Sequence, residues 1–284
     1  MRLPDFLIIG AMKAGTTTLY RDLASNPHIF FPADKEPGNL CNDRTLTSEG
    51  KAEYAALFRK ASPAQLCGEA STDYAKLPDV PCVPQRALAI TGPNTRIIYM
   101  IRDPVSRIIS QHRHERIAGT CELPLREALQ AESRFIDYSR YAMQIKPWIA
   151  AFGERQVFVQ VMEQYIADRH ACHERICAFL GIPPRPELLQ DKVFNAADGK
   201  PVLRGPIKYL AESMIYRRLI RPLFGPASRQ YLRERLLPRA RVKADTLTDA
   251  QREYLNAELT DDWELIRYLQ VLEVNNPDDS QTRT

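Results

Sequence analysis

The sequence predicts an α/β protein in which a central parallel β-sheet is flanked by helices on both faces. Short, uninterrupted apolar runs, typical of strands that are buried on both sides, alternate along the chain with longer segments of helical periodicity. Glycine or proline follows several of the helical segments and marks their ends. The 284 residues suffice for a single domain with one large hydrophobic core.

Each element has its own local signal. The expected strands are the apolar runs at residues 5–10, 66–69, 96–101 and 156–161. The expected helices lie at residues 16–25, 51–60, 105–119, 125–132, 138–152 and 168–180, with several more after Gly205. Pro27, Gly153 and Gly181 close three of these helices. We expect residues 1–273 to form the domain, with a helical C-terminal part, and the polar tail 274–284 to be disordered.

The stretch FLIIGAMKAGTTTLYRDL, residues 6–23, joins the first strand to the first helix through a turn of small residues. Such a turn holds phosphate groups because backbone N–H groups point at the anion and the helix dipole favours its charge. Lys13 adds a cation, and the threonines that open the helix add hydroxyl donors. The nucleoside triphosphate loop GxxxxGK[ST] has a different spacing, since here Lys13 precedes Gly15 and Thr16 stands in the place of the lysine.

A second anion-binding pattern, RIIYMIRDPVSRIISQHRHER, covers residues 96–116. Arg102 follows the strand 96–101, at the end where parallel sheets bind ligands. Its planar guanidinium can donate two parallel hydrogen bonds to a phosphate. Asp103 is expected to cap the next helix and Pro104 to start it, so no magnesium-binding carboxylate and no metal site is inferred. Ser110 lies about two turns into that helix.

Together these motifs resemble the sulfotransferases that use 3′-phosphoadenosine 5′-phosphosulfate (PAPS), in a bacterial, carbohydrate or heparan-sulfate type of that family rather than the cytosolic small-molecule type. KxGTT resembles the family's loop for the 5′-phosphosulfate, and R-D-P-V-x-R-x-x-S its 3′-phosphate site. Residues 194–205 resemble the loop that folds over the nucleotide, and residues 68–75, 139–180 and 246–269 extend the likeness over most of the chain. The resemblance implies a nucleotide site of Lys13, Ala14, Gly15, Thr16, Thr17, Thr18, Arg102, Ser110, Lys200 and Arg204.

The same resemblance implies catalytic roles for two residues. Lys13 would stabilise the oxygen that leaves with the nucleotide. Glu36, in the segment Lys35-Glu36-Pro37, resembles the family's glutamate that takes the proton of the acceptor. Where the carbohydrate-type enzymes have aromatic residues after this segment, the chain has Gly38-Asn39-Leu40. The sequence therefore leaves a small molecule, a glycan and a lipid open as hydroxyl acceptors.

Charge and cysteine usage bear on partners and location. The net charge is +4, and residues 200–243 carry twelve Lys and Arg against two Glu, together with an apolar stripe. A helix pair with a solvated basic face, steering of an anionic ligand, and peripheral contact with an anionic membrane all fit this segment. No nucleic-acid recognition motif accompanies it.

The six cysteines show no metal-binding spacing, and the first strand begins too early to leave room for a signal peptide. We expect a cytoplasmic protein with free thiols. The alternatives to a sulfotransferase are a P-loop nucleotide kinase and a nucleotide-binding protein that has lost catalysis.

Overall fold

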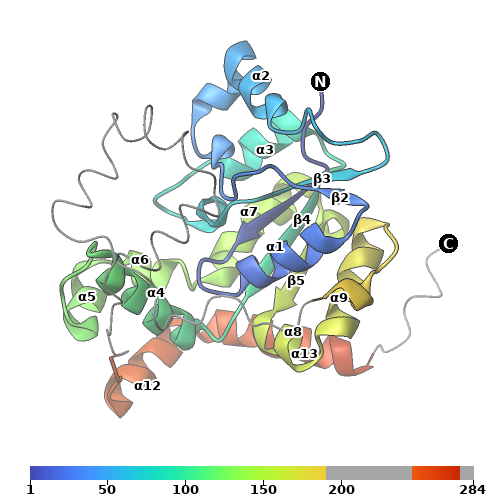
Figure 1. The fold of residues 1–284 in the computed structure, drawn as a ribbon. Helices are drawn as coiled ribbons and strands as arrows, with labels where there is room; N and C mark the ends of the chain where they lie inside the picture. Colours follow the sequence, from blue (N-terminus) through green and yellow to red (C-terminus); the bar gives the residue numbers. More distant parts are fainter. Residues whose placement is uncertain (190–244, 276–284) are drawn as a thin grey trace, which may run out of the picture.

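The computed structural model describes residues 1–189 and 245–275 of the chain (Figure 1). At its centre lies a five-stranded sheet of order β2-β3-β1-β4-β5. Its strands are β1 (Phe6–Gly10), β2 (Ile29–Phe30), β3 (Leu66–Ala70), β4 (Arg96–Ile101) and β5 (Val157–Val161). Every neighbouring pair is parallel. The expected α/β class, a P-loop-type parallel sheet flanked by helices, is confirmed.

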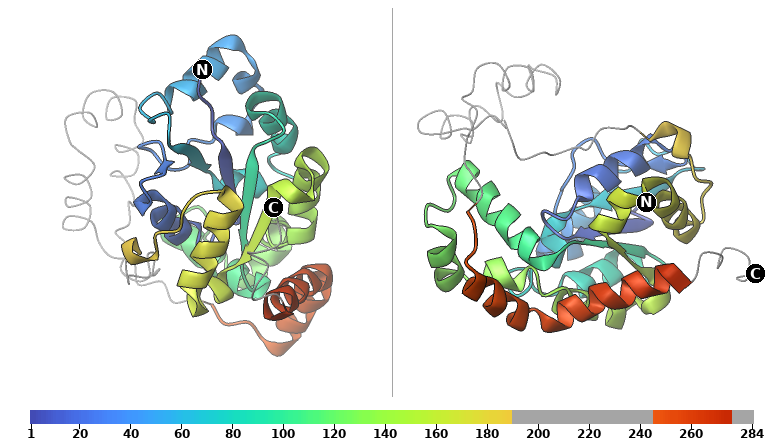
Figure 2. Two further views of the ribbon diagram at one scale, coloured as in Figure 1. Left: turned by 90° about the vertical axis from the view of Figure 1, so that its right-hand side faces the viewer. Right: turned by 90° about the horizontal axis from the view of Figure 1, so that it is seen from below.

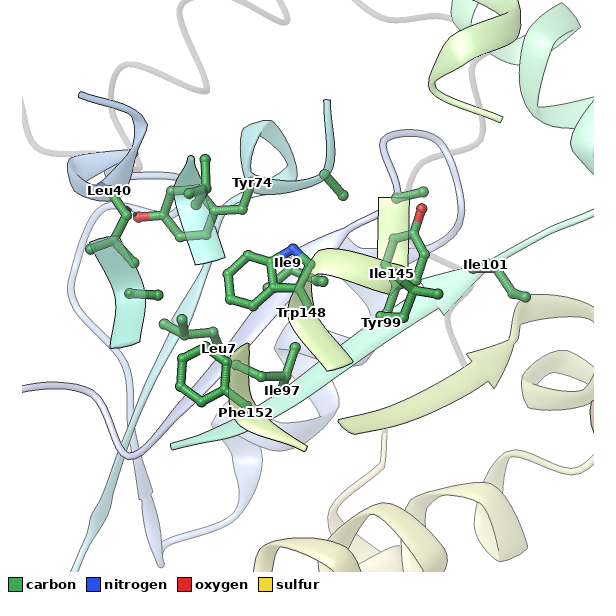
Figure 3. Packing of buried hydrophobic residues seen from close by; sticks show 14 of the residues in the cluster. Leu7, Ile9, Leu40, Tyr74, Ile97, Tyr99, Ile101, Ile145, Trp148 and Phe152 are labelled. Atoms are coloured by element: carbon green, nitrogen blue, oxygen red, sulfur yellow. Dashed lines mark hydrogen bonds between the residues drawn. The ribbon is translucent and has the colours of Figure 1, made fainter. Parts of the chain in front are cut away.

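The strands bury both of their faces, which explains their uninterrupted apolar sequences. On β1, Leu7 and Ile9 join one hydrophobic cluster, while Phe6 and Ile8 join a second cluster on the opposite face. The first cluster includes residues of α3 (Val83–Thr91), α7 (Tyr141–Phe152) and α13 (Thr260–Asn275). Figure 3 shows Trp148 and Phe152 packed beside Leu7 and Ile97 in it. The second cluster includes residues of α1 (Thr16–Ser25), α8 (Met162–Ala167) and α9 (Arg169–Leu180).

A third hydrophobic cluster lies beyond the carboxyl end of β4 and joins four helices. They are α4 (Pro104–Ala118), α5 (Leu125–Ala131), α6 (Arg134–Asp137) and α12 (Asp249–Glu258). Figure 2 shows α12 and α13 lying end to end along one side of the molecule. The helix α2 (Ser48–Ala56) lies at the opposite end of the molecule from α12 (Figure 1).

The structure corrects several element boundaries. The helix expected at residues 138–152 is α7, which begins at Tyr141, and the short helix α6 ends before the expected range, at Asp137. The helix expected at residues 51–60 is α2, Ser48–Ala56. Among the strands and α-helices of the described residues, four were not predicted: β2, α3, α6 and α8. The expected helical C-terminal part is present in α12 and α13, and α13 reaches Asn275, while residues 206–244 and 276–284 lie outside the described residues.

Candidate active site at the carboxyl edge of the sheet

The strand order brings three predicted site segments to one edge. β1 lies between β3 and β4, and all three run in the same direction, so their carboxyl ends lie side by side. The chain leaves β1 toward α1 and leaves β4 toward α4. In open α/β sheets, ligands bind at the carboxyl ends of the strands, where neighbouring connections diverge. The fold therefore defines a nucleotide-binding architecture of the P-loop type with its candidate site at this edge.

The phosphate loop, residues 11–15, connects β1 to α1. The Ala14 N–H donates to the carbonyl of Ala11 at 3.1 Å. Lys13 and Gly15 both lie in the left-handed region, with φ of 69° and 85°. A Cβ at Gly15 would lie 3.3 Å from the Met162 side chain, so both backbone conformation and packing favour glycine there. The loop is thus a tight turn that brings the backbone of residues 13–16 to the start of α1.

The start of α1 suits an anion. Gly15 is its N-cap and provides no side-chain cap, and its first turn holds no acidic residue. The first N–H groups of a helix carry the positive end of its dipole. Ala14 and Thr16 are buried, whereas Thr17 and Thr18 are partly exposed, so the buried pair can contribute to a ligand mainly through the backbone.

Arg102 connects the end of β4 to the phosphate loop. Its Nη1 donates to the carbonyl oxygen of Lys13 at 3.4 Å, and its Nε lies 3.8 Å from Oε1 of Glu163. The predicted N-cap is confirmed, since Asp103 Oδ1 accepts the Ser106 N–H at 2.6 Å. The structure thus brings Lys13 and Arg102, predicted from segments about ninety residues apart, into direct contact.

Ser110 is half-buried on α4, two turns after Arg102. The orientation of α4 is fixed by Arg107, which the sequence analysis did not single out and which is fully buried. The Arg107 guanidinium donates to Gln111 Oε1 at 2.7 Å, to the Phe135 carbonyl at 2.6 Å and to Ser139 Oγ. Burial lowers the pKa of Arg107. Lys200 and Arg204, the other predicted nucleotide ligands, lie outside the described residues.

Glu36 lies on the other side of β1, at the carboxyl end of β3. Its N–H donates to the carbonyl of Ala70 at 3.0 Å, and Thr72 Oγ1 donates to its Oε1 at 3.4 Å. Lys35 Nζ donates to the same carboxylate oxygen at 2.7 Å. The side chain of Glu36 is 46% exposed and therefore open to an acceptor.

The histidines lie elsewhere. The His28 carbonyl accepts the Leu66 N–H at 2.8 Å, which places His28 at the amino end of β3, opposite the phosphate loop. His112 is buried in α4, where its ring bonds to the carbonyl of Leu123. The carboxylate of Asp73, a second acidic residue beside Thr72, forms an ion pair with Lys76 at 2.5 Å.

Behind Glu36 lies the Glu69 network, defined here as Tyr54, Glu69, Ser71 and Tyr74, which the sequence analysis did not single out as functional. Glu69 is 1% exposed on β3. Ser71 Oγ donates to its Oε1 at 2.7 Å, and the Tyr54 hydroxyl donates to its Oε2. Burial raises the pKa of Glu69, while hydrogen bonds from Ser71, Tyr54 and Tyr74 act in the opposite direction. The buried Glu69 side chain thus accepts hydrogen bonds from the hydroxyl groups of both Ser71 and Tyr54.

The described residues contain no cluster of three or more His, Cys, Asp or Glu side chains able to hold a metal ion. In the same part of the chain, none of the helices has both the length and the apolar character needed to cross a bilayer. All six cysteines are free thiols, two of them, Cys172 and Cys177, buried on α9.

Comparison with known proteins identifies the family. The family model described as "Sulfotransferase domain" matches residues 3–201, well over half of the chain. The chain therefore belongs to the sulfotransferase family, as its motifs predicted.

Individual relatives agree with this assignment. The heparan sulfate glucosamine 3-O-sulfotransferase 3B1 of Mus musculus is 26% identical over 256 residues, covering 81% of this chain and 63% of that protein. The chain thus spans somewhat less than two thirds of that relative's length.

Solved structures show the same fold. The sulfotransferase from Alicyclobacillus acidocaldarius is 27% identical with a TM-score of 0.58, covering 69% of this chain and 88% of that one. The sulfotransferase domain from the curacin biosynthetic pathway is 17% identical with a TM-score of 0.53, covering 92% of this chain and 99% of that domain.

Proposed function

We propose that this protein transfers the sulfuryl group of PAPS to a hydroxyl group of an acceptor. The observation that carries the proposal is the contact between Arg102, at the end of β4, and the phosphate loop at the end of the adjacent strand β1. The two motifs that resemble a 5′-phosphosulfate loop and a 3′-phosphate site therefore lie at the same edge of the sheet. A nucleotide with phosphates at both its 5′ and 3′ positions matches such a pair of cationic sites.

The nucleotide would be held by both sides of that edge. The backbone N–H groups of Gly15 and Thr16 and the hydroxyls of Thr17 and Thr18 would bind the 5′-phosphate. Arg102 and Ser110 would bind the 3′-phosphate, and Lys200 and Arg204 would close over the nucleotide. No metal ion takes part in this proposal.

Sulfuryl transfer then requires charge stabilisation and a base, by analogy with phosphoryl transfer. The acceptor oxygen forms a bond to sulfur while the bond from sulfur to the phosphate oxygen breaks, which releases 3′,5′-adenosine bisphosphate. Glu36 accepts the proton that the acceptor hydroxyl loses. Lys13 neutralises the negative charge that develops on the leaving oxygen.

The acceptor class proposed is a glycan, because the relatives include a glucosamine 3-O-sulfotransferase of heparan sulfate. A lipid headgroup or a small molecule offers the same chemistry. If the acceptor is a lipid headgroup, we propose that residues 200–243 contact an anionic membrane. A cytoplasmic location is proposed from the six free thiols, which suit a reducing compartment.

The test is transfer of label. The protein is incubated with PAPS labelled in its sulfate and an extract of its source cell, and labelled products are separated and identified. We expect one class of hydroxyl compound to gain the label, without added magnesium and only with active protein. Phosphorylation of an extract component from labelled ATP, with no sulfate transfer, would instead support the nucleotide kinase.

A further inference from the structure

The backbone of Glu36 is held in a conformation that residues with side chains rarely adopt. Its φ is 61°, in the left-handed region. Such a conformation persists only where the surrounding structure fixes it, and it occurs preferentially at functional sites. Residues 36–40, called here the Glu36 segment, must therefore be held in place by contacts with other parts of the chain.

Three alternate N–H groups of the Glu36 segment are bound by the last residue of β3 and by two residues that follow it. The Glu36 N–H donates to the Ala70 carbonyl at 3.0 Å. The Gly38 N–H donates to Ser71 Oγ at 3.1 Å, and the Leu40 N–H donates to the Tyr74 hydroxyl at 3.2 Å. Figure 3 shows the Tyr74 hydroxyl directed toward Leu40. Two of the three anchors are therefore side-chain hydroxyl oxygens rather than backbone carbonyls.

Each of these hydroxyls has a single proton, and Glu69 accepts that of Ser71. Ser71 Oγ donates to Glu69 Oε1 at 2.7 Å, and the Tyr74 hydroxyl lies near the same carboxylate. A hydroxyl whose proton is committed to a carboxylate presents its lone pairs to other donors. The Glu69 carboxyl group thereby orients the Ser71 oxygen that accepts the Gly38 amide, and it lies near the Tyr74 hydroxyl that accepts the Leu40 amide.

We infer that Glu69 is a positioning residue, which acts through Ser71 and Tyr74 to hold the Glu36 segment in the geometry that Glu36 needs. The inference rests on the proposed function insofar as Glu36 is taken as the base. Glu69 itself is 1% exposed and lies on the strand behind the segment, so its side chain is not accessible to a nucleotide or an acceptor. Burial of a carboxyl group costs free energy unless hydrogen bonds compensate, and here the hydroxyls of Tyr54 and Ser71 supply them.

The first test is hydrogen exchange on the full chain, which needs no acceptor. We expect Tyr74→Phe to speed exchange of the Leu40 amide, and Glu69→Gln to speed exchange of the Gly38 amide, each by about tenfold, the effect of losing one hydrogen bond. The matched controls are Tyr165→Phe and Asp22→Asn. Tyr165 is 1% exposed, and its hydroxyl donates to Oδ2 of the buried Asp22 at 2.6 Å, on the opposite face of the sheet. These controls should leave exchange in residues 36–40 unchanged.

The second test separates positioning from general loss of structure. Glu69→Gln should lower turnover of labelled PAPS by about tenfold or more, while the KM for PAPS and the affinity for 3′,5′-adenosine bisphosphate stay within about threefold. Tyr165→Phe should change neither. Unchanged exchange in the Glu36 segment of both network variants would overturn the inference, as would faster exchange with full turnover. A Glu36→Gln variant with full turnover would instead remove the base assignment and leave the exchange result standing.

Discussion

The two sides of β1 build their parts of the site in different ways. On the β4 side, the groups lie on the connection that directly follows each strand: the phosphate loop follows β1, and Arg102 and then Ser110 of α4 follow β4. On the β3 side, Glu36 belongs to a segment about thirty residues before the strand end on which it rests. The nucleotide side is thus made by strand-to-helix turns, and the Glu36 side by contacts between distant segments.

This difference determines which residues each side needs to keep its geometry. A strand-to-helix turn has its geometry set by local backbone conformation, as at Gly15. The Glu36 segment depends on hydroxyl and carboxylate groups of the Glu69 network, supplied by other parts of the chain. The same nucleotide site can therefore be combined with a Glu36 side whose sequence varies more freely. This is expected where function lies in loops placed on a rigid scaffold.

The largest expected effect comes from Glu36→Gln, which preserves size and removes the proton acceptor. We expect turnover to fall by about 10²–10⁴-fold, the usual contribution of a general base. Binding of 3′,5′-adenosine bisphosphate should stay near that of the unchanged protein, since Glu36 lies on the other side of β1 from Arg102. Single-turnover transfer from labelled PAPS and calorimetry measure the two quantities. Loss of nucleotide binding would contradict the separation of the two sides.

Arg102→Ala should produce the opposite pattern. Removing a charged hydrogen-bond partner from a phosphate should weaken binding of 3′,5′-adenosine bisphosphate by about 2–4 kcal/mol. Binding of 5′-AMP, which lacks the 3′-phosphate, should change little. Equal losses for the two nucleotides would assign Arg102 a structural role, through its contacts with Lys13 and Glu163.

The smallest effect concerns stability against pH. Asp262 accepts the Ala142 N–H at 2.8 Å and so caps α7, whose first residue, Tyr141, packs edge-on against Tyr99 of β4. Burial raises the pKa of Asp262 from 3.8 to about 6. Because the folded state binds this proton more tightly than the unfolded state, the stabilisation is complete below about pH 4 and is lost as the pH rises through 6.

Asp262→Asn removes this titration and keeps a carbonyl oxygen for the Ala142 N–H. The free energy of unfolding should then vary less between pH 4 and 6.5, by roughly 1–2 kcal/mol. Urea denaturation at several pH values measures it. An unchanged pH profile in the variant would show that Asp262 does not titrate in this range. Burial also raises the pKa of Glu69, so Glu69→Gln provides the equivalent measurement on the other side of β1.

The sequence predicted those strands and helices whose residues carry a clear local pattern. β1 and β4 were found because strands buried on both faces have uninterrupted apolar sequences. The two-residue strand β2 is too short to show any period, and α3 begins with Val83-Pro84 after two earlier prolines, Pro78 and Pro81, which favour a loop reading.

The same limit applies to the site. Lys13 and Arg102 were recognised from contiguous motifs, and the fold then brought them together. Arg107 and Glu69 were missed because their partners, such as Phe135 and Tyr54, lie far away in sequence. The available signal was a charged residue within a buried pattern, which identifies a buried polar group without indicating its partners.

The most direct test of the central claim is calorimetry of three nucleotides in buffer with a chelator and no added metal. We expect 3′,5′-adenosine bisphosphate to bind far more tightly than either ATP or 5′-AMP, and magnesium to change none of the three affinities much. Tight, magnesium-dependent binding of ATP with no binding of the bisphosphate would contradict it.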